Sequence, residues 1–180
     1  MANRITKVIT KKGDDGYTSM ADGSRVSKSN LTLNAIGEID ELNSWIGLLC
    51  SLEELKKEKE FLLKIQNCLF DIGGILTTNS KEPLKIKHVE ALEQRTKEIN
   101  EKFPELENFV LPGGSTQSSI IHISRTVCRR AERSLVSADE SEPIEKSCII
   151  YVNRLSDFLF VLARKVNLDN GFKEIIWSQE

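Results

Sequence analysis

Apolar residues recur at steps of three and four from about residue 31 to about residue 167, and this spacing constrains the fold more than any other feature. Ile36, Ile39 and Leu42 show it first, and side chains so spaced share one face of an α-helix. The pattern predicts five helices. The first begins at about 31, the second runs from a capping box at Ser51 to about 78, and the third lies around 89–99. The fourth runs from an N-cap at Ser115 to about 137, and the fifth from Pro143 to about 167.

The links between these segments are short, and neither strand-like alternation nor an internal repeat is visible. We therefore expect an all-α fold, an antiparallel five-helix bundle with an extended N-terminal arm. A chain of 180 residues suits one hydrophobic core, so we expect a single domain over 1–180. Its parts are a loop-like arm (1–29), the bundle (30–169) and a tail (170–180) that follows a helix stop at Asn170-Gly171.

Composition excludes several classes of function. A net charge of −2 and a pI near 5.9 disfavour a nucleic-acid binder. The longest strongly apolar run, 158–163, is too short to span a bilayer, and the N-terminus has no signal-like segment, so we expect no membrane association and a cytoplasmic protein. The four cysteines form no C-x-x-C pair, which favours buried thiols over a zinc site or disulfides.

The stretch 124–133 carries four arginines on a predicted helix. Arg125, Arg129 and Arg133 are spaced i, i+4, i+8 and share one face, where like charges repel. Guanidinium groups bind phosphate oxygens well, and Glu132 could hold a divalent cation among them, so one interpretation is a polyphosphate site. The alternatives are a solvated basic face or ion pairs with acidic residues elsewhere, and on this stretch alone the two interpretations are equally supported.

The arm contains a second candidate phosphate site. Residues 10–19 combine glycines, which let backbone amides approach an anion, with Lys11, Lys12, Thr18 and Ser19. The order of residues does not fit a Walker A loop, and a polar tail is the simpler interpretation of this stretch alone. Arg25, Lys28 and the arginines of 124–133 make a phosphate-binding arm plausible.

Other polar and aromatic residues leave two interpretations open. Asn153 and Asp157 lie i, i+4 among apolar residues, so a ligand or an interhelical hydrogen bond should satisfy them. Asp40 could pair with an arginine of 124–133, in its own chain or a neighbour, or it could be solvated. Phe109 could plug a helix start, and His122, on the face of Arg125, is more simply structural than catalytic.

Six blocks, taken in order, resemble the PduO-type ATP:cob(I)alamin adenosyltransferases. The blocks are Thr10-Lys-Lys-Gly-Asp-Asp-Gly, Asp22-Gly-Ser-Arg-Val-Ser-Lys28, Gly37-Glu-Ile-Asp-Glu-Leu-Asn43, Phe109-Val-Leu-Pro-Gly-Gly114, 125–133 and Tyr151-Val-Asn-Arg-Leu-Ser-Asp157. The resemblance implies a homotrimer with ATP between subunits, where the arm of one subunit covers nucleotide held by another. Lys12, Glu38 and Ile9 depart from the family's usual residues.

The resemblance also implies roles for individual residues. Arg125 and Arg129 would act on the departing triphosphate, Glu132 would hold magnesium, Phe109 would pack under the corrin ring, and Asp40 would pair with an arginine across the interface. The nucleotide contacts would be Thr10, Lys11, Lys12, Gly13, Thr18, Ser19, Lys28, Arg129, Arg130, Ala131, Glu132, Arg133 and Asn153.

The implied reaction is transfer of the 5′-deoxyadenosyl group of ATP to the cobalt of cob(I)alamin, which gives adenosylcobalamin and triphosphate. Cobalt is itself the nucleophile, so no protein nucleophile or base is needed, and positioning and charge neutralisation remain for the protein. A flavin-type reductant and an adenosylcobalamin-dependent enzyme are possible partners. The alternatives are a non-catalytic carrier or scaffold that binds a corrinoid or a partner helix, and a nucleotide-sensing bundle.

Overall fold

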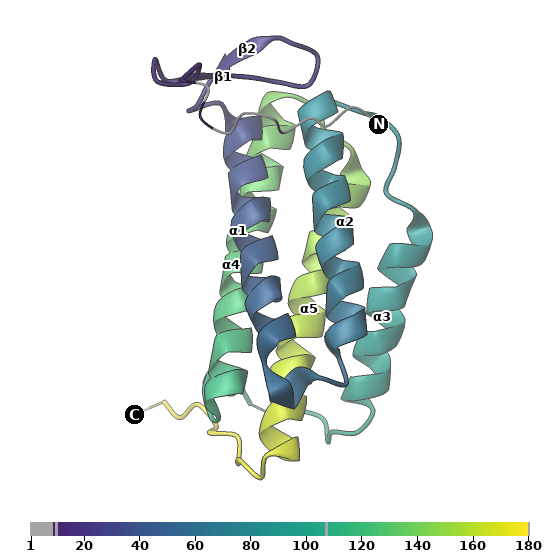
Figure 1. Cartoon of the computed structure of the whole chain (residues 1–180). Helices are drawn as coiled ribbons and strands as arrows, with labels where there is room; N and C mark the ends of the chain where they lie inside the picture. Colours follow the sequence, from purple (N-terminus) through teal and green to yellow (C-terminus); the bar gives the residue numbers. More distant parts are fainter. Residues whose placement is uncertain (1–8, 10, 107, 180) are drawn as a thin grey trace.

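The computed structural model describes residues 9, 11–106 and 108–179. Within them, helices lie side by side with alternating direction (Figure 1), which confirms the predicted antiparallel five-helix bundle. The α-helices are α1 (Leu31–Ser51), α2 (Lys59–Thr78), α3 (Ile86–Asn100), α4 (Thr116–Ser141) and α5 (Lys146–Asp169), with a short 3-10 turn, η1 (Glu53–Leu55).

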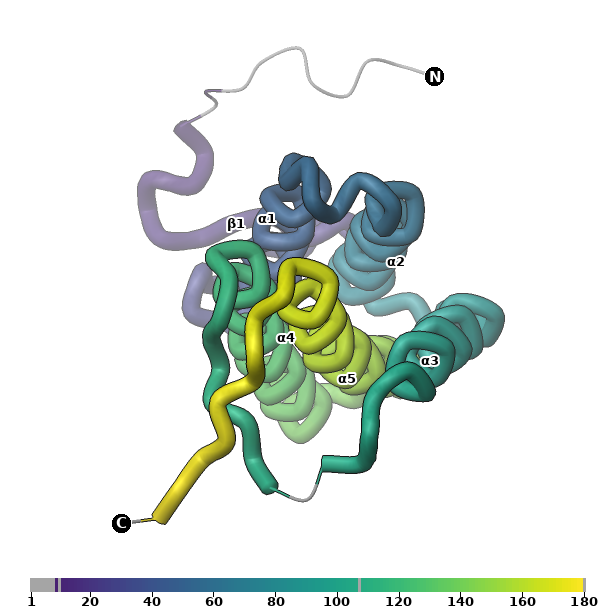
Figure 2. The backbone as a smooth tube through the Cα atoms, turned by 90° about the horizontal axis from the view of Figure 1, so that it is seen from below, coloured from purple at the N-terminus to yellow at the C-terminus, as the bar shows by residue number. Residues whose placement is uncertain are grey.

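The core forms where α5 meets the other helices. Phe158, Leu159 and Leu162 are fully buried on α5, and the ring of Phe158 contacts Phe61 of α2 at 5.2 Å between centroids. Viewed along the bundle, α3 packs beside α5 and away from α1 (Figure 2). Apolar residues occupy nearly every side of α5, which suits its central place in the bundle.

Several helix ends differ from the prediction. Ser51 ends α1 instead of capping the next helix, because its hydroxyl donates back to the carbonyl of Leu48 at 2.7 Å. Pro143 precedes α5, whose N-cap is Glu145, a side chain that accepts from the amide of Ser147. The N-cap at Ser115 is confirmed by its hydrogen bond from the amide of Ser118.

The arm contains a small hairpin that the sequence analysis missed. β1 (Tyr17–Ser19) pairs antiparallel with β2 (Arg25–Ser27), so the absence of strands was a wrong prediction. The turn forms because the Asp22 carboxylate accepts from the amide and hydroxyl of Ser24, while Gly23 adopts a φ of +86°. Strands of three residues are too short to show an alternating pattern.

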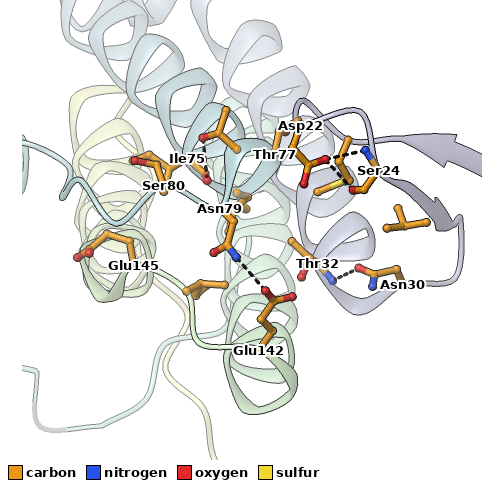
Figure 3. A pocket seen from close by; sticks show the side chains of 15 residues that line it. Asp22, Ser24, Asn30, Thr32, Ile75, Thr77, Asn79, Ser80, Glu142 and Glu145 are labelled. Carbon is orange, nitrogen blue, oxygen red and sulfur yellow. Dashed lines mark hydrogen bonds between the residues drawn. The ribbon is translucent and has the colours of Figure 1, made fainter.

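The hairpin lies over the end of the bundle where α1 begins and α2 ends (Figure 1). The amide of Ala21 donates to the carbonyl of Thr77 there, and a polar pocket of about 170 Å³ lies beside this contact (Figure 3). Glu142 and Glu145 from the α4–α5 link add negative charge to its wall, which disfavours phosphate at this place.

Across the described parts of the chain, none of the helices has the length and apolar character that a bilayer crossing requires. A Cβ added at Gly73 or Gly74 of α2 would meet nothing within 4 Å in this chain. Both glycines line a groove of about 730 Å³ between α1 and α2.

Candidate active site

A cavity of about 630 Å³ lies between the middle turns of α4 and α5, the segment before α4 and the C-terminal tail. One wall is the segment before α4, a second is the C-terminal tail, and the rest comes from α4 and α5. The side chains that give it chemical character are Phe109, Trp177, Arg125, Arg129, Asp157 and Phe160. The cavity therefore joins aromatic rings to guanidinium groups.

Arg125 and Arg129 enter the cavity from successive turns of α4. Arg125 is half-buried, its guanidinium lies 5.8 Å from the centroid of Phe160, and its buried Nε has no hydrogen-bond partner among the described residues. Burial, and then the charge of Arg129, lower the pKa of Arg125. An anion bound here would offset both the burial of the Arg125 charge and its repulsion by Arg129.

The other two arginines of this stretch do not join the cavity wall. Arg133 is exposed and donates to the carbonyl oxygen of Arg129 at 3.1 Å. Arg130 faces α1, where its Nε donates to Glu38 at 2.6 Å and its Nη2 to Glu41. The bond to Glu38, and then the bond to Glu41, raise the pKa of Arg130. The predicted nucleotide contact at Arg130 is thus bonded to carboxylates of its own chain.

A hydrogen bond between Asn153 and Glu132 connects α5 to α4 about one helical turn from Asp157 and Arg129. The Asn153 amide donates to Oε1 of Glu132 at 2.8 Å and accepts from Arg154 at 2.7 Å. Ala131, another predicted nucleotide contact, is fully buried in the core, so its side chain does not reach the surface. Asp157 has apolar neighbours in the sequence but is exposed at the cavity in the folded chain.

Phe109 presents its ring to solvent, with 79% of the residue exposed. The ring of Trp177 stands edge-on to it at 6.4 Å between centroids. Sequence reasoning missed Trp177, because tail residues 170–180 carry no periodic signal, and Phe160, because it is one of many apolar residues of α5. The available clue was the apolar run Ile175-Ile176-Trp177 in a tail without helical periodicity.

None of the described arm residues lines this cavity, and the hairpin lies at the end of the bundle opposite the C-terminal tail (Figure 1). Lys28 donates to the carbonyl of Gly13 at 2.7 Å, and the side chains of Lys28 and Thr18 line the groove between α1 and α2. Lys11, Lys12 and Ser19 are exposed, and Thr10 lies outside the described residues. Within the part of the chain that the structure describes, the arm therefore does not meet Arg125 and Arg129 of the same chain.

Asp40 lines the same α1–α2 groove and is exposed. Within the described residues it makes no ion pair with an arginine of α4, and Glu38 and Glu41 take that role. His122 is buried beside Phe160, as expected for a structural residue.

A metal ion would find few ligands in the chain itself. Among the described residues, no group of three or more histidine, cysteine, aspartate or glutamate side chains is placed to hold one. Glu132 nevertheless fits the mode in which Mg²⁺ binds through one or two carboxylates together with substrate phosphates.

Comparison with known proteins identifies the family. The family model for cobalamin adenosyltransferase matches residues 8–166. A cobalamin adenosyltransferase from Cupriavidus metallidurans is 45% identical over 181 aligned residues, and the alignment covers 100% of this chain and 98% of that protein. A corrinoid adenosyltransferase from Bacillus subtilis is 43% identical, with 96% and 93% covered. The chain therefore belongs to the cobalamin adenosyltransferase family.

Solved structures narrow the assignment. A variant PduO-type ATP:corrinoid adenosyltransferase from Lactobacillus reuteri, complexed with cobalamin and ATP, is 32% identical with a TM-score of 0.91 and covers 96% of this chain and 97% of that one. Another variant, complexed with ATP, is 33% identical with a TM-score of 0.89, with 95% and 100% covered. The prediction of a PduO-type ATP:corrinoid adenosyltransferase is confirmed.

Proposed function

We propose that this chain forms adenosylcobalamin at the cavity that holds Phe109, Arg125 and Arg129. The observation that carries the assignment is the shared wall: an exposed aromatic ring and two guanidinium groups without an ion-pair partner among the described residues face one space of about 630 Å³. An apolar macrocycle and a polyphosphate are the two ligand chemistries that such a wall suits.

In the proposed reaction, the cobalt of cob(I)alamin attacks C5′ of ATP. The cobalt–carbon bond forms as the C5′–oxygen bond breaks, and the electron pair leaves with triphosphate. Arg125 and Arg129 stabilise the negative charge that grows on this leaving group. The Glu132–Asn153 hydrogen bond of 2.8 Å keeps α4 and α5 in register around it.

The proposed metal is magnesium, held by Glu132 and the phosphates. Oε1 of Glu132 accepts from Asn153, and its position between Arg129 and Arg133 in α4 suits a shared polyphosphate. A bound Mg²⁺ would add Lewis-acid stabilisation of the leaving triphosphate. Asn153 orients the carboxylate in either case.

We also propose that the active assembly is a homotrimer in which the arm of one subunit covers the cavity of another. The hairpin of the arm lies at the end of the bundle opposite the C-terminal tail, and no described arm residue lines the cavity of its own subunit (Figure 1). Asp40 is exposed and Nε of Arg125 has no partner within the described residues, and a contact between subunits would pair them. The apolar walls of the α1–α2 groove add area for such a contact.

The proposal extends to the setting of the reaction. The cysteines of this chain are free, and three of them are buried, which suits a reducing compartment such as the cytoplasm. Cob(I)alamin requires a strong reductant, for which a flavin-type donor is proposed, and an adenosylcobalamin-dependent enzyme would receive the product.

A turnover assay tests the proposal. Purified chain supplied with ATP, Mg²⁺ and chemically reduced cobalamin should form adenosylcobalamin and release one triphosphate for each product molecule, followed by absorbance and phosphate analysis. Binding of cobalamin without ATP binding or turnover would favour a carrier and overturn the proposal.

A further inference from the structure

The C-terminal tail is bonded to the segment that carries Phe109. The amide of Leu111 donates to the carbonyl of Ile175 at 2.8 Å, and the amide of Trp177 donates to the carbonyl of Phe109 at 2.7 Å. Val110 and Ile176 form an antiparallel bridge between these bonds, and the yellow tail follows the segment that leads into α4 (Figure 2). We call residues 172–177 the C-terminal strap.

An ion pair ties the strap to α5. Nε of Arg164 donates to Oε1 of Glu174 at 2.7 Å, and Nη2 donates to Oε2 at 3.1 Å. Arg164 is only 4% exposed, and its guanidinium lies 4.5 Å from the centroid of Phe103. A two-pronged bond between planar groups fixes orientation as well as distance. The bundle therefore determines where Glu174, and with it the strap, is held.

The other end of the Phe109 segment is held by the next turn of α5. Asn167 donates to the carbonyl of Gly113 at 2.8 Å and accepts from the amide of Ser115 at 3.0 Å. Gly114 has a φ of +104°, and a Cβ there would lie 2.3 Å from the Asn167 side chain, so only glycine fits. Arg164 and Asn167 thus anchor both sides of one loop.

We propose that Arg164 is a positioning residue for the corrinoid, acting through Glu174 and the strap on Phe109 and Trp177. The inference rests on the proposed function, in which Phe109 meets the corrin ring. The Phe109 ring is solvent-exposed, so core packing does not fix it, and its carbonyl is bonded to the strap. Release of the strap should therefore misplace both rings at the cavity while the arginines of α4 stay in place.

Glu174→Ala tests this without removing the buried arginine. The change should raise the KM for cobalamin about tenfold, because small displacements of a positioned group weaken productive binding, and should leave the KM for ATP within about twofold. Glu174→Gln keeps an acceptor oxygen for Nε of Arg164, so its KM for cobalamin should lie between those of the unaltered protein and Glu174→Ala. Lys173→Ala alters the neighbouring exposed strap residue and should resemble the unaltered protein.

A second measurement separates this inference from the proposed function. Amide hydrogen exchange of peptides covering 108–112 and 172–179 should be at least about tenfold faster in Glu174→Ala, whether or not the protein turns over. If the unaltered chain failed to make adenosylcobalamin but showed this change, the proposed function would fall and the anchor would stand. Unchanged exchange, or an equal rise of both KM values, would overturn the positioning role.

Discussion

Arg130 donates a hydrogen bond from Nε to Oε2 of Glu38, 2.6 Å away, and so joins α4 to α1 across a separation of 92 residues. Its neighbour Arg129 lines the cavity with Phe109. Two consecutive arginines of one cluster thus have different surroundings, and substitutions at them should have different consequences.

Arg129→Ala should lower kcat/KM for ATP about 10²- to 10³-fold, because it removes a cation from the leaving triphosphate. Arg130→Ala should change kcat/KM less than about threefold and lower the free energy of unfolding by up to about 1 kcal/mol, as expected for a partly exposed ion pair. Steady-state kinetics and urea titrations measure both quantities. A loss of activity at Arg130 as large as at Arg129 would restore its predicted role as a nucleotide contact.

Phe109→Ala should weaken cobalamin turnover and leave ATP binding unchanged. The ring is 79% exposed, so its removal should not cost core packing, and the melting temperature should stay within about 2 °C. Calorimetric titration of ATP and the KM for cobalamin check the two halves of this prediction. The exposed Leu63 of α2 supplies the control, since Leu63→Ala removes a comparable side chain away from the cavity.

His122 makes stability depend on pH. Burial, and then the charge of Arg125, lower its pKa from 6.5 to about 4, an effect that Glu174 opposes. The unfolded chain therefore binds a proton between pH 6.5 and 4 that the folded chain excludes, so folding loses free energy as pH falls through this window, by about 3 kcal/mol at most. In His122→Gln, the free energy of unfolding should fall less between pH 7 and pH 4.5 than in the unaltered chain. Urea titrations at these two pH values measure that fall in each protein. Equal slopes in the two proteins would contradict the assignment.

A partly buried ion pair joins Arg95 of α3 to Glu58, the residue before α2. Glu58 is 3% exposed and accepts from Nη2 of Arg95 at 2.8 Å on both carboxylate oxygens. Arg95→Ala should cost on the order of 2 kcal/mol of unfolding free energy, because it leaves a buried carboxylate with fewer donors. Arg95→Ala combined with Glu58→Gln should recover part of that loss, and the turnover of both variants should stay near that of the unaltered chain.

The helices could be predicted because their signal is local and periodic. Caps such as Ser115 and the central place of α5 follow from neighbouring residues in the sequence. The partners of Arg130 could not be predicted, since the i, i+4 spacing that grouped Arg125, Arg129 and Arg133 carries no information about carboxylates on another helix. The bond between Trp177 and Phe109 joins two loops, where no period exists to reveal a pairing.

The site itself was predicted in part. The cavity brings together Phe109, Arg125 and Arg129 as the resemblance implied, while Ala131 and Arg130 face the core and α1. The arm was recognised from composition, but only the folded chain shows that none of its described residues lines the cavity.

Subunit complementation tests the central claim most directly. One variant lacks residues 1–15 and keeps the hairpin, the other carries Arg129→Ala, and each alone should be inactive. If the arm of one subunit completes the cavity of another, unfolding and refolding the two variants together in equal amounts should restore about a quarter of the unaltered activity, the fraction of sites that draw an intact arm and an intact cavity from different subunits. Activity that stays at the level of the separate variants, in mixed trimers verified by native mass measurement, would contradict a site shared between subunits.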